Sequence, residues 1–300
     1  MGSDRVGCYA LPLRVSLVKE GPVSTEFVPG RISISIPHWQ VLPLLQPCLR
    51  SIRKHTRGRD VEVIVIDNGS KDESLDYLRS LNWIRLIERP EEGLHNFPHN
   101  VWTSHDISVK EATGEFLMTM HTDLFVKSSD WLDPYFREMA KGEHIAGVGT
   151  WKLEEVNRLY ELQKRFFHVV RSNIKYALGM KKKTYVWQQN HYPKDFCAMY
   201  RRRAIIDNGL TFRSIEGKNG FYDQSGGYSI SAQLWDAGYE TSVIPVREML
   251  PRIVHLSHGT AAVSPHKTHR RNQEKLEQKA HSLFDEEWVK ELQTDTSLDR

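Results

Sequence analysis

The stretch Val61-Glu62-Val63-Ile64-Val65-Ile66-Asp67-Asn68-Gly69-Ser70-Lys71-Asp72 decides the fold. Five of its first six residues are apolar, which is typical of a strand buried on both faces of a parallel sheet. Asp67 then falls at the carboxyl end of that strand, the edge where open α/β sheets bind ligands. Gly69 and Ser70 favour a tight turn, and Ser70 is a candidate cap for a helix starting near Lys71. We expect Asp67 to bind a ribose or base, although a solvated turn acid would show the same pattern.

Strands and helices alternate around this stretch, which predicts an α/β fold with a mostly parallel sheet flanked by helices. In the first half, strands are expected at 31–36, 61–66, 83–87 and 116–120, with helices at 42–55, 72–81 and 100–112. The second half is less regular; we expect a long helix over 153–178, a strand at 195–200, a helix at 228–237, short strands at 242–246 and 252–256, and an amphipathic helix around 281–292.

The composition indicates a soluble globular protein, with 39% apolar residues, 26% charged residues and a net charge of +3. This small charge does not indicate a nucleic-acid partner. No apolar run approaches the roughly 20 residues that cross a bilayer, and Arg14 and Lys19 interrupt the apolar patches that a signal peptide would need. Cys8, Cys48 and Cys197 lack metal-ligand spacing. A reduced, cytoplasmic protein is therefore expected.

The chain divides into an N-terminal extension over 1–30, a main domain over 31–260 and a C-terminal helical tail over 261–300. Within the main domain, the segment 152–183 holds nine Lys or Arg against three Glu. Its apolar residues, such as Phe166 and Phe167, and its Lys181-Lys182-Lys183 run could seat the protein peripherally on the anionic inner face of a membrane. A dimer contact or a cover for the sheet would explain the same pattern.

The strand at 116–120 leads into His121-Thr122-Asp123. Residues two apart on an extended chain share a face, so His121 and Asp123 can converge on one ion or phosphate. A carboxylate suits a hard divalent cation, and an imidazole beside it shifts the preference from Mg²⁺ toward Mn²⁺. A polar strand end followed by a helix cap is the alternative.

Taken in order, these segments resemble the inverting glycosyltransferases of family 2, which have the GT-A fold. Ile34–Gln40 stands where the family's first strand runs into Pro-Thr-x-Asn, and Asp67–Asp72 matches its Asp-Asp/Asn-Gly-Ser-x-Asp run. His105–Glu115 is similar to the family's Arg-Asn-x-Gly-Ile-x-x-Ala-x-Gly-Glu segment, and His121–Asp123 stands in place of its metal-binding Asp-x-Asp. The resemblance covers 31–140 well and the remainder loosely.

This resemblance implies an enzyme that transfers a sugar from a nucleoside-diphosphate donor to an acceptor hydroxyl, with inversion in a single displacement. The acceptor would be a glycan, a lipid-linked sugar or a small molecule. The family's pattern assigns the nucleoside to Pro37, His38, Asp67 and Asn68, and the diphosphate to the neighbourhood of His121 and Asp123. Thr122, between them, is also expected to contact the donor.

The family also implies a divalent cation, Mn²⁺ or Mg²⁺, that bridges the diphosphate. Asp123 carries over as a metal ligand, while His121 replaces the first acid of the motif. Some GT-A enzymes complete the metal site with a late histidine. His258, beside Gly259, is the expected third ligand, ahead of His255.

Inverting transfer needs a base that accepts the proton of the acceptor hydroxyl. The family often carries this acid in a Glu-Asp pair ahead of a Gly-Tyr, and the same spacing from Gly238-Tyr239 reaches Gly226-Gly227. The nearest acid, Asp223, is the expected base, with Glu216 in reserve; a turn-forming Asp beside glycines is the alternative. The polar-aromatic run 187–191 is either a sugar contact or an ordinary loop.

Two other functions remain open. A sugar nucleotidyltransferase has a similar nucleotide-binding half, but it opens with a Gly-rich loop, and Pro37–Gln40 contains no glycine. A degenerate family member would bind a sugar nucleotide or a partner without catalysis. The missing Glu-Asp pair and His121 favour this second alternative.

Overall fold

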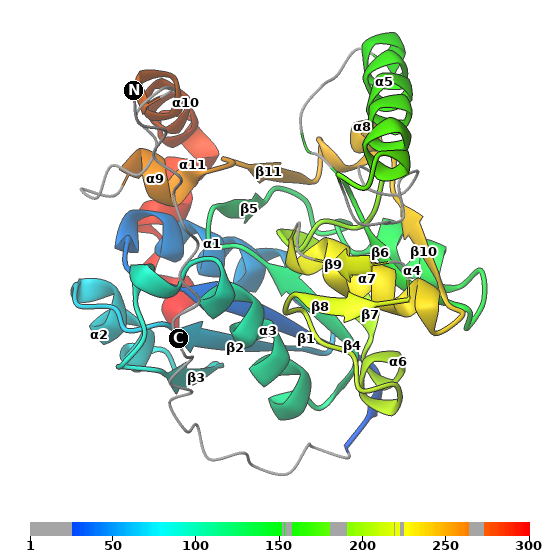
Figure 1. Cartoon of the computed structure of the whole chain (residues 1–300). Coiled ribbons are helices and arrows are strands. Elements are labelled where there is room, and N and C mark those ends of the chain that lie inside the picture. Colours follow the sequence, from blue (N-terminus) through cyan, green and yellow to red (C-terminus); the bar gives the residue numbers. More distant parts are fainter. Residues whose placement is uncertain are drawn as a thin grey trace.

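The computed structural model describes residues 26–151, 153, 158–180, 191–218, 220–222, 225–263 and 273–300. Its centre is a seven-stranded sheet with the strand order β10-β6-β7-β4-β1-β2-β3 (Figure 1). The strands are β1 (Val28–His38), β2 (Val61–Asp67), β3 (Ile84–Glu88), β4 (Gly114–Met120), β6 (Ile145–Gly149), β7 (Cys197–Arg201) and β10 (Glu240–Val243).

The sheet is mostly parallel, as predicted. Strand β1 pairs in parallel with β2 and β4, β2 with β3, and β6 with β10. Only β7 runs the other way among these strands, antiparallel to both β4 and β6. The carboxyl ends of β1, β2, β4 and β6 therefore lie along one edge of the sheet, which we call the carboxyl edge.

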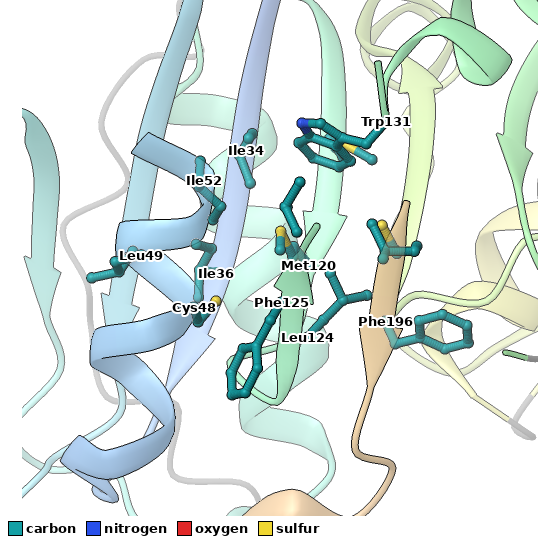
Figure 2. Close-up of a cluster of buried hydrophobic side chains, with 14 of the residues drawn as sticks. Ile34, Ile36, Cys48, Leu49, Ile52, Met120, Leu124, Phe125, Trp131 and Phe196 are labelled. Atoms are coloured by element: carbon teal, nitrogen blue, oxygen red, sulfur yellow. The ribbon is translucent and has the colours of Figure 1, made fainter. Parts of the chain in front are cut away.

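Both faces of the sheet are apolar, which explains the consecutive apolar residues Val63–Ile66 of β2. Ile34, Val63 and Met118 lie in one buried cluster with helix α1 (Leu42–His55), and Figure 2 shows part of that cluster. Ile64 and Leu117 point to the other face and pack with helix α3 (His99–Glu111). Alternate residues of a strand point to opposite faces, so each inner strand needs apolar residues at consecutive positions.

The other helices cover the faces and the ends of the sheet. The predicted helix at 72–81 is α2 (Glu73–Ser80), the one at 153–178 is α5 (Arg158–Ala177), and the one at 228–237 is α7 (Gly226–Asp236). Short helices without a prediction are η1 (Leu94–Asn96), α4 (Asp133–Met139), α6 (Arg202–Asp207), α8 (Val246–Met249) and α9 (Gly259–Val263).

The helix predicted around 281–292 is two helices, α10 (Gln273–Phe284) and α11 (Glu287–Thr294), followed by η2 (Thr296–Asp299). Helices α11 and η2 pack on α1, α10 packs on α9 and α11, and Leu283 and Val289 join the apolar cluster. The side chain of Arg50 from α1 is buried among them. It donates to Asp299 (Nη2 to Oδ2, 2.6 Å) and to the carbonyl oxygen of Leu292 (2.9 Å).

Two small sheets lie beside the main one. Strands β8 (Ile215–Gly217) and β9 (Gly220–Tyr222) pair antiparallel. Strands β5 (Leu124–Val126) and β11 (Ile253–His255) pair antiparallel as well, and β5 follows β4 at the carboxyl edge. The sequence did not predict strands β5 and β6. Each is short, and each forms by pairing with a strand that is distant in sequence.

Candidate active site

The Asp67 turn lies at the carboxyl edge, as predicted, but its carboxylate faces its own loop. Asp67 is 1% exposed. One oxygen, Oδ2, accepts hydrogen bonds from the backbone N–H groups of Gly69 (3.1 Å) and Ser70 (3.0 Å), while Oδ1 accepts one from the Ser70 hydroxyl. Gly69 has φ +78, and a Cβ there would lie 2.3 Å from the Glu92 carbonyl oxygen, so only glycine fits. The carboxylate thus stabilises the turn in this structure.

Ser70 does not cap a helix, contrary to the sequence-based expectation. Helix α2 begins at Glu73, after an Asp72 N-cap. The Ser70 hydroxyl oxygen accepts a hydrogen bond from the backbone N–H of Gln40 (2.8 Å), and Asp72 Oδ2 accepts one from that of Val41 (2.9 Å). Gln40 and Val41 both have positive φ, 53 and 68, so these bonds hold an unusual backbone after β1.

The other residues assigned to the nucleoside are also buried. Pro37 lies within β1 opposite Ile66, and the His38 Nε2 is 2.9 Å from the Ser74 hydroxyl. Burial lowers the pKa of His38 to about 4, with Asp67 and Asp72 opposing the shift in part, so His38 is neutral at pH 7. Asn68 Oδ1 accepts a hydrogen bond from Arg89 Nη1 (2.6 Å).

His121 and Asp123 come together at the carboxyl edge through a turn, not through the alternation of a strand. Strand β4 ends at Met120, and the Leu124 N–H donates to the His121 carbonyl oxygen (3.2 Å) before β5 starts. The His121 N–H also donates to the Phe196 carbonyl oxygen (3.0 Å). Thr122 lies in the same turn and is half-buried.

A third side chain reaches this turn from strand β11. His255 pairs with Leu124 across the β5–β11 ribbon, and its Nε2 lies 3.2 Å from Asp123 Oδ1. The ring stacks on Phe196, with centroids 4.3 Å apart. Pairing with β5 therefore fixes His255 against the acid.

The His121-Asp123-His255 group (one ligand atom from each) has all three atoms within 4.8 Å of one another. Burial alone would raise the pKa of Asp123, but His255, His121 and the Gly259 N–H (2.9 Å from Oδ2) outweigh it and hold that pKa well below its usual value. His121 Nε2 is buried and has no hydrogen-bond partner within the described residues. Two imidazoles and an ionised carboxylate are donors that suit Mn²⁺ and other borderline divalent cations.

His258, the third ligand expected from the sequence, lies outside this group. It is exposed, and its φ of 61 follows a φ of 52 at Ser257 as the chain turns into α9. His255 takes its place in the group. The register of β11 against β5 places His255 beside Asp123. The sequence around either histidine does not reveal that register.

The expected base, Asp223, lies outside the described residues, as does most of the 187–191 run, of which only His191 is described. Glu216 is an exposed residue of β8. The glycines in place of the acidic pair have a steric cause. A Cβ at Gly226 would lie 2.6 Å from Trp102 Cδ1 and 2.9 Å from Asp195 Oδ2.

Asp195 is thus an acid that the sequence reasoning overlooked. It is buried, comes just before β7, and places a carboxylate oxygen where a side chain on Gly226 would stand. Because Met120 pairs with Cys197, Asp195 lies near the carboxyl edge of β4. An acid directly ahead of a strand that starts at this edge was the available signal.

The sequence was compared with the profiles of known protein families. Residues 33–209 match the sequence profile of the family described as glycosyl transferase family 2. The chain belongs to that family. It is therefore a glycosyltransferase, and its mostly parallel sheet is the GT-A fold. The resemblance inferred from the Asp67 turn and the His121 motif is confirmed, whereas the roles of individual residues remain predictions.

Solved glycosyltransferases are similar to this chain. Staphylococcus aureus TarS (residues 1–349) is 12% identical over 89% of this chain and 75% of its own, with a TM-score of 0.50. The mannosyltransferase PcManGT from Pyrobaculum calidifontis, solved with GDP-Man and Mn²⁺, is 17% identical over 93% of this chain and 76% of its own, with a TM-score of 0.48. No curated protein sequence matches. At 12% identity the likeness to TarS extends to the fold alone.

Proposed function

We propose that this family 2 glycosyltransferase moves a sugar from a nucleoside-diphosphate donor to an acceptor hydroxyl, inverting the anomeric carbon in one displacement. The observation that carries the proposal is the His121-Asp123-His255 group at the carboxyl edge. Ligands of open α/β sheets bind at this edge, and a buried, ionised carboxylate between two imidazoles is a place to hold a cation against a diphosphate.

Asp123, His121 and His255 would hold the cation, Mn²⁺ or Mg²⁺, which when bound would offset negative charge on the departing diphosphate. The nucleoside would lie beside the ends of β1 and β2, where Pro37, His38, Asp67 and Asn68 shape the surface. Because Asp67 accepts hydrogen bonds within its own turn and Asn68 accepts one from Arg89, we assign them to holding that surface rigid.

The reaction itself needs one proton acceptor. The acceptor oxygen forms a bond to the anomeric carbon while the bond from that carbon to the diphosphate breaks, and the hydroxyl proton passes to a carboxylate. We retain Asp223 as the proposed base. Asp195 is a buried acid near the carboxyl edge that has no other proposed role, so its substitution is the comparison for that of Asp223.

Transfer tests the function directly. The full chain, incubated with a panel of nucleotide sugars and simple hydroxyl acceptors, is expected to release nucleoside diphosphate in the presence of Mn²⁺ and to stop when EDTA is added. NMR of the product should show the anomeric configuration opposite to that of the donor. A thermal shift with donor but no hydrolysis or transfer under any condition would instead assign the chain to the degenerate, binding-only alternative.

Asp223→Asn is expected to lower turnover by about 10²- to 10⁴-fold, the usual contribution of a general base. The amide is nearly isosteric but cannot take the proton, so donor affinity should stay unchanged. Turnover at saturating donor and a binding titration measure the two effects separately. Asp195→Asn is the matched comparison; a loss of turnover in that variant alone would move the role to Asp195.

A further inference from the structure

Helix α5 carries a row of exposed apolar side chains. Leu162, Phe166, Val170 and Ile174 recur every four residues and are 55%, 59%, 40% and 55% exposed, and Phe167 beside them is 69% exposed. Residues spaced by four stack along one face of a helix. Figure 1 shows α5 standing out from the body of the molecule. These five residues are the apolar face of α5.

The helix presents the opposite side to the rest of the protein. Val169 and Ser172 are its buried residues among those described, and they lie on the far side of the helix from Val170 and Ile174. A surface helix of a globular protein normally packs its apolar stripe on the core and leaves its polar stripe in water. In α5 most of the apolar stripe is exposed to water. An exposed apolar patch of this kind is typical of a surface that binds a partner or a membrane.

The chain around that face is strongly cationic. From Arg158 to Lys183 the sequence contains eight Lys or Arg and one acid, Glu161. Lys164 and Arg171 are exposed on α5, and Lys175 is half-buried. On a helical wheel of 100° per residue these three form a row next to Phe167 and Ile174. The apolar face is thus bordered by positive charge.

The connection that carries α5 joins two strands of the main sheet. The connection leaves β6 at Gly149 and returns to β7 at Cys197, and the Lys194 N–H donates to the Thr150 carbonyl oxygen (2.9 Å). Cys197 pairs with Met120, the last residue before His121. The connection that carries α5 therefore starts and ends at the carboxyl edge, beside the candidate active site.

We propose that α5 docks this protein on an anionic membrane surface. The apolar face enters the boundary between headgroups and acyl chains, while Lys164, Arg171 and Lys175 meet the anionic headgroups. A second copy of the chain fits less well, because it would bring the same excess of Lys and Arg to the interface and like charges repel. None of the described helices has the length and apolar character needed to cross a bilayer, so the contact is peripheral.

Vesicle flotation tests this docking. The full chain is expected to float with vesicles of phosphatidylcholine and phosphatidylglycerol, to float poorly with phosphatidylcholine alone, and to lose binding as salt screens the headgroups. The double variant Phe166→Ser/Phe167→Ser should bind at least about tenfold more weakly, because moving each phenyl ring from water into the membrane lowers the free energy of the bound state. Lys164→Gln/Arg171→Gln should lose the preference for anionic vesicles.

Phe97→Ser is the matched control, since Phe97 is 63% exposed outside α5 and its loss should leave flotation unchanged. Circular dichroism and donor hydrolysis in solution show whether each variant keeps its fold and site, independently of membrane binding. Failure of the wild-type chain to float, or equal flotation of the double variant, would refute the proposal. A concentration-dependent dimer that the double variant abolishes would assign the face to a second copy.

Discussion

Asp123→Asn is expected to lower turnover about a thousandfold, the size of effect seen when one preorganised electrostatic group is removed from a site. The amide keeps an oxygen that can accept from the Gly259 N–H, so the local backbone should stay in place. It lacks the charge that a divalent cation requires between His121 and His255. Turnover at saturating donor and Mn²⁺ measures the loss.

A second readout separates metal binding from any general damage. The melting temperature of the wild-type chain should rise when Mn²⁺ is added, because a ligand of the native state stabilises it by mass action, and that rise should vanish in Asp123→Asn. Asp76→Asn, on the exposed surface of α2, is the control and should behave as wild type. Wild-type turnover in the Asp123→Asn variant would show that Asp123 is not a metal ligand needed for the reaction.

Arg50→Ala is expected to lower the free energy of unfolding by about 3 kcal/mol, the lower end of the range for breaking a buried ion pair. The Arg50 side chain is 3% exposed and bonds to Asp299 and to the carbonyl oxygens of Leu292 and Gln293. Removing it takes this donor from both carbonyl oxygens and leaves Asp299 with the Tyr77 hydroxyl (2.7 Å) at the junction of α1 and η2. Urea denaturation followed by circular dichroism measures the change.

Arg79→Ala is the matched control for this prediction. Arg79 pairs with Glu88 through Nη2 at 2.7 Å, but its side chain is 52% exposed. Exposed pairs typically contribute 1 kcal/mol or less, so its loss should barely move the urea midpoint. An Arg50→Ala midpoint as close to wild type as that of Arg79→Ala would show that the C-terminal elements do not depend on the arginine.

Local sequence patterns predicted much of the fold. The bounds expected for α1 match the structure, because Pro43 marks the first turn and the apolar spacing continues to Ile52. Strand β2 was clear because a doubly buried strand needs consecutive apolar residues. Strand β5 has only three residues, and it exists because β11 pairs with it from more than a hundred positions away. No window of the sequence contains both partners.

The site was predictable in its location but not in its contacts. Asp67 and Asp123 both follow strands of the sheet, so each was expected at the carboxyl edge. Whether a carboxylate faces a ligand or its own loop depends on side-chain rotation, and Asp67 turns back to Gly69 and Ser70. The approach of His255 to Asp123 depends on strand register. Likewise, periodicity located α5 but not which face it turns to water.

The link between Arg50 and Asp299 spans 249 positions, which has a consequence for how the protein is made. A ribosome adds residues in order, so α1 emerges long before its partner. Until then its guanidinium must stay hydrated or bind elsewhere, and the apolar surface later covered by α10 and α11 is open to other chains. Newly made chains should therefore need chaperone protection until the segment that carries α10, α11 and η2 docks.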